Sequence, residues 1–188
     1  MTPTMTHTMT TRRSLLLRGG ALLAGGALLA GGTTLAAAPA SWSAPAALAK
    51  PTPALLTALA ASPVVYLTPL RRNGSESRCH AEVWFVARGA TVYVVTANTA
   101  WRATAIGQGM NRARLWAGDF GNWKQAGGKF RAAPGFVASG ARVTDAKEID
   151  QALDLYGSKY RVQWLLWSGR FHNGLKDGSR VMLRYTHV

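Results

Sequence analysis

Three short runs rich in β-branched and aromatic residues follow one another closely, and they constrain the fold more than any other feature of the chain. The runs cover 64–68, 80–87 and 91–96. Asn73-Gly74 separates the first two runs and Arg88-Gly89 separates the last two. Glycine-containing pairs of this kind favour tight turns between antiparallel strands. The sequence therefore predicts an antiparallel meander.

The second and third runs are apolar on both faces. A strand with one face in water alternates between apolar and polar residues. Val83-Trp84-Phe85-Val86 and Val92-Tyr93-Val94-Val95 do not alternate in this way. We expect these strands to form the wall of a barrel that a helix or a second subunit covers on the outside.

The rest of the chain adds helices and further strands. Asp145 and Glu148 have the spacing of a capping box, which predicts a helix that begins at Asp145 and ends at Gly157. Strands first, helices later and one closing strand indicate an α+β fold, an antiparallel barrel of about six strands with flanking helices. The other predicted elements are a helix at 99–108, strands at 112–117, 135–143 and 181–185, a hairpin turn at Gly127-Gly128, and a helical stretch at 158–167.

The first 49 residues have the order of a secretory leader. Paired arginines, Arg12-Arg13, precede a glycine-thinned apolar run at 21–38, and Ala47-Leu48-Ala49 offers a cleavage pattern. This leader resembles a twin-arginine signal, which implies passage through the twin-arginine export machinery as a folded protein. An uncleaved membrane anchor is the alternative. Residues 50–62 are predicted to be a linker with a short helix near 55–60, and 63–188 the folded domain.

Charge and cysteine content limit the function classes. Only 3 of the 22 Lys and Arg residues lie in the leader, whereas all 8 acidic residues lie beyond it, so the domain is strongly basic. Such a balance favours anionic partners. The single cysteine, Cys79, excludes an internal disulfide. We expect Cys79 to be a buried strand residue.

The order of motifs in 63–118 resembles the FMN-binding split barrel, the superfamily of pyridoxamine-phosphate oxidases and deazaflavin-dependent reductases. The residues that carry the resemblance are Leu67-Thr68, Asn73-Gly74, Val83-Trp84-Phe85, Tyr93-Val94-Val95-Thr96, Arg102 and Asn111-Arg112-Ala113-Arg114-Leu115. The resemblance implies a flavin-type cofactor, FMN or alternatively the deazaflavin F420, held in a homodimer.

The resemblance also implies where the cofactor phosphate binds. Thr96 and Arg102 become phosphate contacts, with Asn98 and Trp101 as neighbours, and Arg114 is a further candidate. A helix N-terminus, capped here by Asn98 or Thr99, favours an anion, and the guanidinium fork of arginine matches phosphate oxygens. Many members of the superfamily have Lys near this position, where this chain has Trp101 or Arg102.

Three functions remain open from the sequence. The first is an exported oxidoreductase in which the cofactor performs the chemistry on a small-molecule substrate. The second is a non-catalytic module of the same fold that binds a flavin, haem or another anionic ligand. The third, a binder of nucleic acid or of a surface polyanion, is disfavoured because the arginines are dispersed and no RNA-binding motif is present. The histidines show no metal-ligand spacing, so no metal site is predicted.

Overall fold

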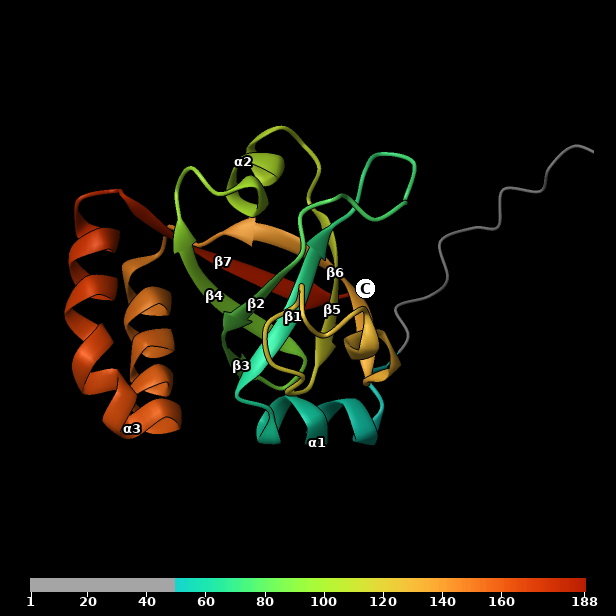
Figure 1. The fold of residues 1–188 in the computed structure, drawn as a ribbon. Coiled ribbons are helices and arrows are strands. Elements are labelled where there is room, and N and C mark those ends of the chain that lie inside the picture. Colours follow the sequence, from blue (N-terminus) through green and yellow to red (C-terminus); the bar gives the residue numbers. More distant parts are fainter. Residues whose placement is uncertain (1–49) are drawn as a thin grey trace, which may run out of the picture. The chain divides into compact units, whose positions relative to one another are not determined.

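The computed structural model describes residues 50–188, and the leader and its cleavage site lie outside these residues. Within 50–188, seven strands form one antiparallel sheet in the order β2-β1-β5-β6-β7-β4-β3 (Figure 1). The predicted α+β class, with an antiparallel barrel and flanking helices, is confirmed. The strands are β1 Val64–Pro69, β2 Ala81–Trp84, β3 Val86–Arg88, β4 Thr91–Ala97, β5 Arg112–Ala117, β6 Gly135–Arg142 and β7 Arg180–His187. The helices are α1 Pro53–Ala61, α2 Trp101–Gly107, α3 Ala146–Lys176 and a 3-10 turn, η1, at Lys129–Ala132.

The predicted run at 80–87 forms both edges of the sheet. It breaks at Phe85 into β2, which pairs with β1, and β3, which pairs with β4. The two edge strands are consecutive in the chain, so the barrel is nearly closed through this one segment. The tight turn at Asn73-Gly74 is present, since Gly74 has a φ of 81° and its amide donates to the Arg71 carbonyl.

Two tyrosines of α3 satisfy the backbone at the break between β2 and β3. The Phe85 amide donates to the hydroxyl of Tyr160 across 2.8 Å, and that hydroxyl lies 2.8 Å from the carbonyl oxygens of Phe85 and Pro63. The Tyr156 hydroxyl lies 3.1 Å from the carbonyl oxygens of Trp84 and Tyr93. A buried backbone group without a partner is costly, so these hydroxyls stabilise the irregular seam.

Strand β4 is buried on both faces, as its apolar run predicts. Val92 and Val94 pack inside the barrel, whereas Tyr93 and Val95 pack in a second cluster beneath α3. The outer cover of this wall is thus a helix of the same chain. The homodimer stays a prediction.

Helix α3 begins where the sequence predicts, but its first turn is built differently. Asp145 is the N-cap and its side chain accepts from the Lys147 amide. Glu148 does not complete a capping box. Its carboxylate accepts from Arg184 at 2.8 and 3.0 Å and from the Tyr93 hydroxyl at 2.9 Å. The charged partner on β7 offers a stronger bond than a backbone amide, and it fastens α3 to the barrel.

The predicted end of the helix at Gly157 is wrong. Helical structure continues to Tyr160 and breaks at Arg161, whose φ is 38°. The chain then reverses, so that 146–160 and 162–176 lie side by side as a helical hairpin (Figure 1). A Cβ on Gly157 would lie 3.3 Å from the Trp164 ring, so this glycine lets the indole of the second half pack closely.

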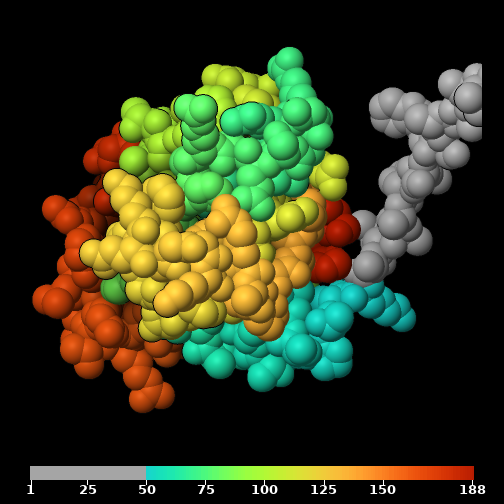
Figure 2. Space-filling view, turned by 45° about the vertical axis from the view of Figure 1, so that its right-hand side comes forward, coloured from blue at the N-terminus to red at the C-terminus, as the bar shows by residue number. Residues whose placement is uncertain are grey.

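The connection from β5 to β6 is not the predicted hairpin at Gly127-Gly128. Although β5 and β6 do pair, residues 118–134 form a folded loop with η1 inside it. Phe130 of this loop stacks on Tyr66 with ring centroids 4.6 Å apart, and it packs edge-on against Trp116. The loop therefore covers the outer face of β1 and β5, between the 70–80 segment and α1 (Figure 2).

Candidate functional site

Thr96 and Arg102, the two residues predicted to hold phosphate, lie in contact. Thr96 is buried near the end of β4, and Arg102 is in the first turn of α2. Arg102 Nη1 donates to Thr96 Oγ1 across 2.8 Å. The short turn at 97–100 makes this contact possible because it folds α2 back over the end of the barrel.

Arg102 also has a donor without an acceptor. Its Nε is buried and forms no hydrogen bond with any residue of 50–188. Burial raises the pKa of Tyr185 on β7, and the charge of Arg102 opposes this rise. A buried N–H that lacks an acceptor is an open position for an oxyanion.

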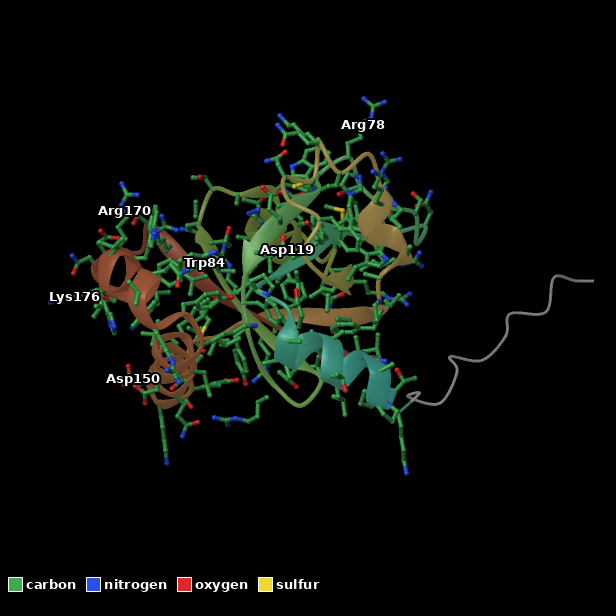
Figure 3. All side chains as sticks on the ribbon, turned by 60° about the horizontal axis from the view of Figure 1, so that its bottom comes forward. Arg78, Trp84, Asp119, Asp150, Arg170 and Lys176 are labelled. Carbon is green, nitrogen blue, oxygen red and sulfur yellow. The ribbon has the colours of Figure 1, made fainter. Side chains whose placement is uncertain are left out.

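A hollow of about 530 Å³ lies beside Trp101, the residue before Arg102. This volume is in the range of small-molecule sites. The lining residues are Arg71, Ser77, Arg78, Cys79 and Trp101. Arg78 projects outward at the rim (Figure 3), so the hollow combines an aromatic wall with cationic edges. Anionic ligands with a flat apolar ring match such a surface.

Cys79 does not lie in a strand as predicted. It is half-buried in the segment between the first turn and β2, and its amide donates to Ser77 Oγ at 3.2 Å. The first tight turn ends at Glu76, and the chain needs 77–80 to reach the edge of the barrel. This detour places Ser77, Arg78 and Cys79 beside Trp101, a grouping that strand alternation alone does not predict.

Asn98 is directed elsewhere. Its Oδ1 accepts from Arg142 Nη2 across 2.9 Å at the end of β6. Neither Asn98 nor Thr99 caps α2, in contrast to the prediction. The N-cap is Ala100, without a side-chain hydrogen bond, since the amide of Ala100 closes a turn on the carbonyl of Ala97 first.

Arg114 is also engaged elsewhere. It lies on the outer face of β5 beside Glu76, with 3.7 Å between Nη1 and Oε1, and Arg131 binds the other oxygen of Glu76 at 2.9 Å. It lines a separate hollow of about 310 Å³ near Trp116. The structure thus brings Thr96, Trp101 and Arg102 together at one end, while Asn98 and Arg114 have other partners. The assignment of all five to a cofactor stays a prediction.

Lys159 is an unusual residue that the sequence gives no signal for. Its Nζ lies 3.4 Å from the centroid of the Phe85 ring, and burial lowers its pKa to about 8. It lines a largely apolar hollow of about 480 Å³ between α1 and α3. Apart from the Ser158 hydroxyl, no other side chain that lines this hollow is polar, so none could take part in acid–base chemistry with Lys159.

His80 has a buried Nδ1 without a hydrogen-bond partner in the described part of the chain. Burial and, secondarily, Arg131 lower its pKa. A neutral imidazole has one protonated and one unprotonated nitrogen. An unprotonated Nδ1 tolerates a buried position without a partner better than a protonated Nδ1 does. The ring lies 5.4 Å from that of Trp123 and 6.3 Å from that of Phe130, so His80 belongs to an aromatic cluster.

Within residues 50–188, no group of three or more His, Cys, Asp or Glu side chains could hold a metal ion. No helix of the described segment has the length and apolar character needed to span a bilayer.

Comparison with known proteins gives similarity at the level of structure only. No family model and no curated protein sequence matches the chain. HutZ, the haem storage protein of Vibrio cholerae, has a TM-score of 0.49 and 14% identity over 74% of this chain and 92% of its own. A candidate pyridoxamine 5'-phosphate oxidase from Listeria innocua has a TM-score of 0.44 and 13% identity over 71% and 90%. A second candidate pyridoxamine 5'-phosphate oxidase, from Lactobacillus delbrueckii, has a TM-score of 0.46 and 11% identity over 74% of this chain and 91% of its own. Similarity of this degree assigns the chain to no family.

Proposed function

We propose that the chain binds a phosphorylated heteroaromatic cofactor, FMN or alternatively a deazaflavin, and works as an oxidoreductase on a small molecule. The observation that carries the proposal is the buried, unpartnered Nε of Arg102 next to Thr96. A phosphate oxygen would supply the missing acceptor, and the Thr96 hydroxyl already orients the guanidinium.

The surroundings of Arg102 support the same ligand class. Trp101 and the aliphatic stems of Arg71 and Arg78 offer an apolar wall for a flat ring. Their guanidinium groups add positive charge to attract and orient an anion. The acidic residue nearest in sequence to this wall, Glu76, is already paired with Arg131, so it does not oppose the anion directly.

Hydride transfer would be the contribution of the cofactor, and binding and orientation that of the protein. In this division of labour no catalytic triad is needed. Arg102 and Thr96 would hold the phosphate end, and Trp101 would limit the access of water to the ring.

A non-catalytic module that binds a flavin, haem or another anionic ligand is the second candidate. The observation that favours it is the engagement of Asn98 with Arg142 and of Arg114 with Glu76. With these two side chains occupied, the ligand contacts are fewer than the resemblance implies.

A binding titration separates the proposal from its alternative. We would purify the chain, record its visible spectrum, and add FMN, deazaflavin or haem while following ligand fluorescence or absorbance. Binding of FMN or deazaflavin and bleaching by reduced nicotinamide support the oxidoreductase. Binding without reduction, or binding of haem alone, supports the module. Failure of all three ligands to bind overturns the oxidoreductase, and it restricts the module to another anionic ligand.

Variants at Arg102 assign the binding to this site. Arg102→Met is expected to weaken FMN binding by tenfold or more, since a charged hydrogen bond of about 1.5–3 kcal/mol is lost. Arg112→Met is the matched control, because Arg112 is exposed on β5. Equal affinity of the two variants would place the ligand elsewhere.

We also propose that the protein reaches its place of action by twin-arginine export, after the cofactor is bound in the cytoplasm. The support is the leader sequence with Arg12-Arg13. Cell fractionation tests this. A double change of Arg12→Lys and Arg13→Lys should retain the protein in the cytoplasm, whereas Arg18→Lys should not. Export of the double variant at the normal level would contradict the proposal.

A further inference from the structure

The second half of α3 carries an apolar stripe on its outer side. Val162, Leu165 and Leu166 are 73%, 80% and 79% exposed. Their spacing of three and four residues places them on one face of the helix. They lie at the tip of the helical hairpin, directly after the break at Arg161. Large aliphatic side chains that gather at this exposure mark an interaction site.

Folding of the hairpin does not require this stripe. The same helix has an inner stripe, in which Trp164 stacks on Tyr156 with centroids 5.5 Å apart and Phe171 packs edge-on against both rings. The inner stripe attaches the second half of α3 to the first half and to the barrel. Within residues 50–188, the outer stripe therefore has no packing role, and it can meet a partner.

The chemistry around the stripe is cationic. Residues 155–176 contain no Asp or Glu, while the basic residues there are Lys159, Arg161, Arg170 and Lys176. Arg170 lies over the Trp167 ring at 5.1 Å, and Arg170 and Lys176 point outward from α3 (Figure 3). The acidic residues Asp150 and Asp154 belong to the first half of α3. They line a hollow together with Trp164 and His172.

A second copy of the chain is a poor occupant for this surface. A two-fold contact brings the same patch of both subunits together. Arg161 would then face basic residues of the other tip, and no acidic residue of 155–176 is present to neutralise them. A partner with dense negative charge above an apolar layer matches both features, and an anionic bilayer surface has this arrangement.

We propose that the tip of α3 docks on an anionic lipid surface. Val162, Leu165 and Leu166 enter the boundary between headgroups and acyl chains. Arg161 and Arg170 bind lipid phosphates. This surface comes from a different part of the chain from Thr96 and Arg102, so it would hold the protein at a membrane irrespective of the cofactor.

Vesicle binding tests the proposal on the full chain. We would measure co-sedimentation with phosphatidylglycerol-containing vesicles and with pure phosphatidylcholine vesicles. The expected result is binding to the anionic vesicles, weakened tenfold or more by Leu165→Ser together with Leu166→Ser. Val188→Ser is the apolar control, because Val188 is exposed at the C-terminus and lies outside α3. Binding to neither vesicle overturns the proposal.

A local probe separates docking of the tip from attraction by the leader or by net charge. In a Cys79→Ser background, an environment-sensitive fluorophore is attached at Leu165→Cys or, as control, at Lys129→Cys. A blue shift at 165 but not at 129 on anionic vesicles supports the proposal. Equal shifts, or binding that survives the double Leu change and vanishes with salt, overturn it in favour of nonspecific attraction. Self-association that the double change abolishes, without vesicle binding, assigns the tip to a second copy instead.

Discussion

Arg102 donates from Nη1 to Oγ1 of Thr96 across 2.8 Å, while its buried Nε donates to no group of residues 50–188. The two residues are only six positions apart, one on β4 and the other on α2. A buried donor without an acceptor costs about 1–3 kcal/mol. The folded chain is therefore less stable as it stands than with an oxyanion at this position.

Inorganic phosphate is expected to raise the melting temperature, because a ligand that binds only the folded state stabilises it. At 100 times the dissociation constant the gain is about 2.7 kcal/mol. Arg102→Met should show no such gain. Differential scanning fluorimetry with phosphate and with chloride at equal ionic strength measures the gain in each protein. An unchanged response of Arg102→Met would contradict the assignment, and Arg112→Met is the matched control.

Loss of the Tyr160 hydroxyl is expected to weaken the barrel seam. Tyr160→Phe leaves the Phe85 amide without its acceptor, and it removes a donor from the carbonyls of Phe85 and Pro63. We expect a loss of about 1–3 kcal/mol in the free energy of unfolding. Urea unfolding measures this loss, and amide hydrogen exchange at Phe85 should accelerate. The control is Tyr185→Phe, since Tyr185 is a buried tyrosine of β7 that takes no part in the hydrogen bonds at the break between β2 and β3. Equal losses in both variants would refute the role of the seam.

The strands were predictable from sequence because β-branched runs and glycine turns are local signals. The break at Phe85 was not, since the hydroxyl that stabilises it comes from Tyr160, 75 positions later. The continuation of α3 past Gly157 was missed for a similar reason. A glycine that ends one helix and a glycine that admits a distant ring, here that of Trp164, look the same in one sequence.

The candidate site was predictable only in part. The pairing of Thr96 with Arg102 follows from the order of motifs in the resemblance. The apposition of Arg78 and Cys79 to Trp101 depends on how 77–80 crosses the end of the barrel, and no residue pattern encodes that path. The apolar stripe after Arg161 has helical spacing in the sequence, but only the reversal of the chain shows that this face is exposed.

Gly140 is expected to be essential for packing between β6 and α2. A Cβ there would lie 2.7 Å from Cε1 of the buried Tyr185 and 3.1 Å from Cδ1 of Ile106. Gly140→Ala should therefore destabilise the fold by about 1–3 kcal/mol. Gly169→Ala is the matched control. It has open space around it inside a helix, so alanine should stabilise by about 0.5–1 kcal/mol. Thermal unfolding compares the two, and a neutral Gly140→Ala would contradict the tight packing.

The Glu148–Arg184 pair should make stability depend on pH below neutrality. Burial acts to raise the pKa of Glu148, but the hydrogen bonds from Arg184 and Tyr93 outweigh it and hold the pKa below its ordinary value of 4.5. The contribution is therefore complete above pH 4.5 and is lost as the pH falls through the lower pKa of the folded state.

Glu148→Gln is accordingly expected to cost about 1.5–3 kcal/mol at pH 7, the range for hydrogen bonds to charged groups. The difference from the parent should shrink as the pH falls below 4.5, because the parent carboxylate then takes up a proton. Urea unfolding at pH 7, 5, 4 and 3 measures the trend, with Asp150→Asn as the control for an exposed carboxylate of the same helix. A constant difference across this series would show that Glu148 stabilises α3 by packing and not by its charge.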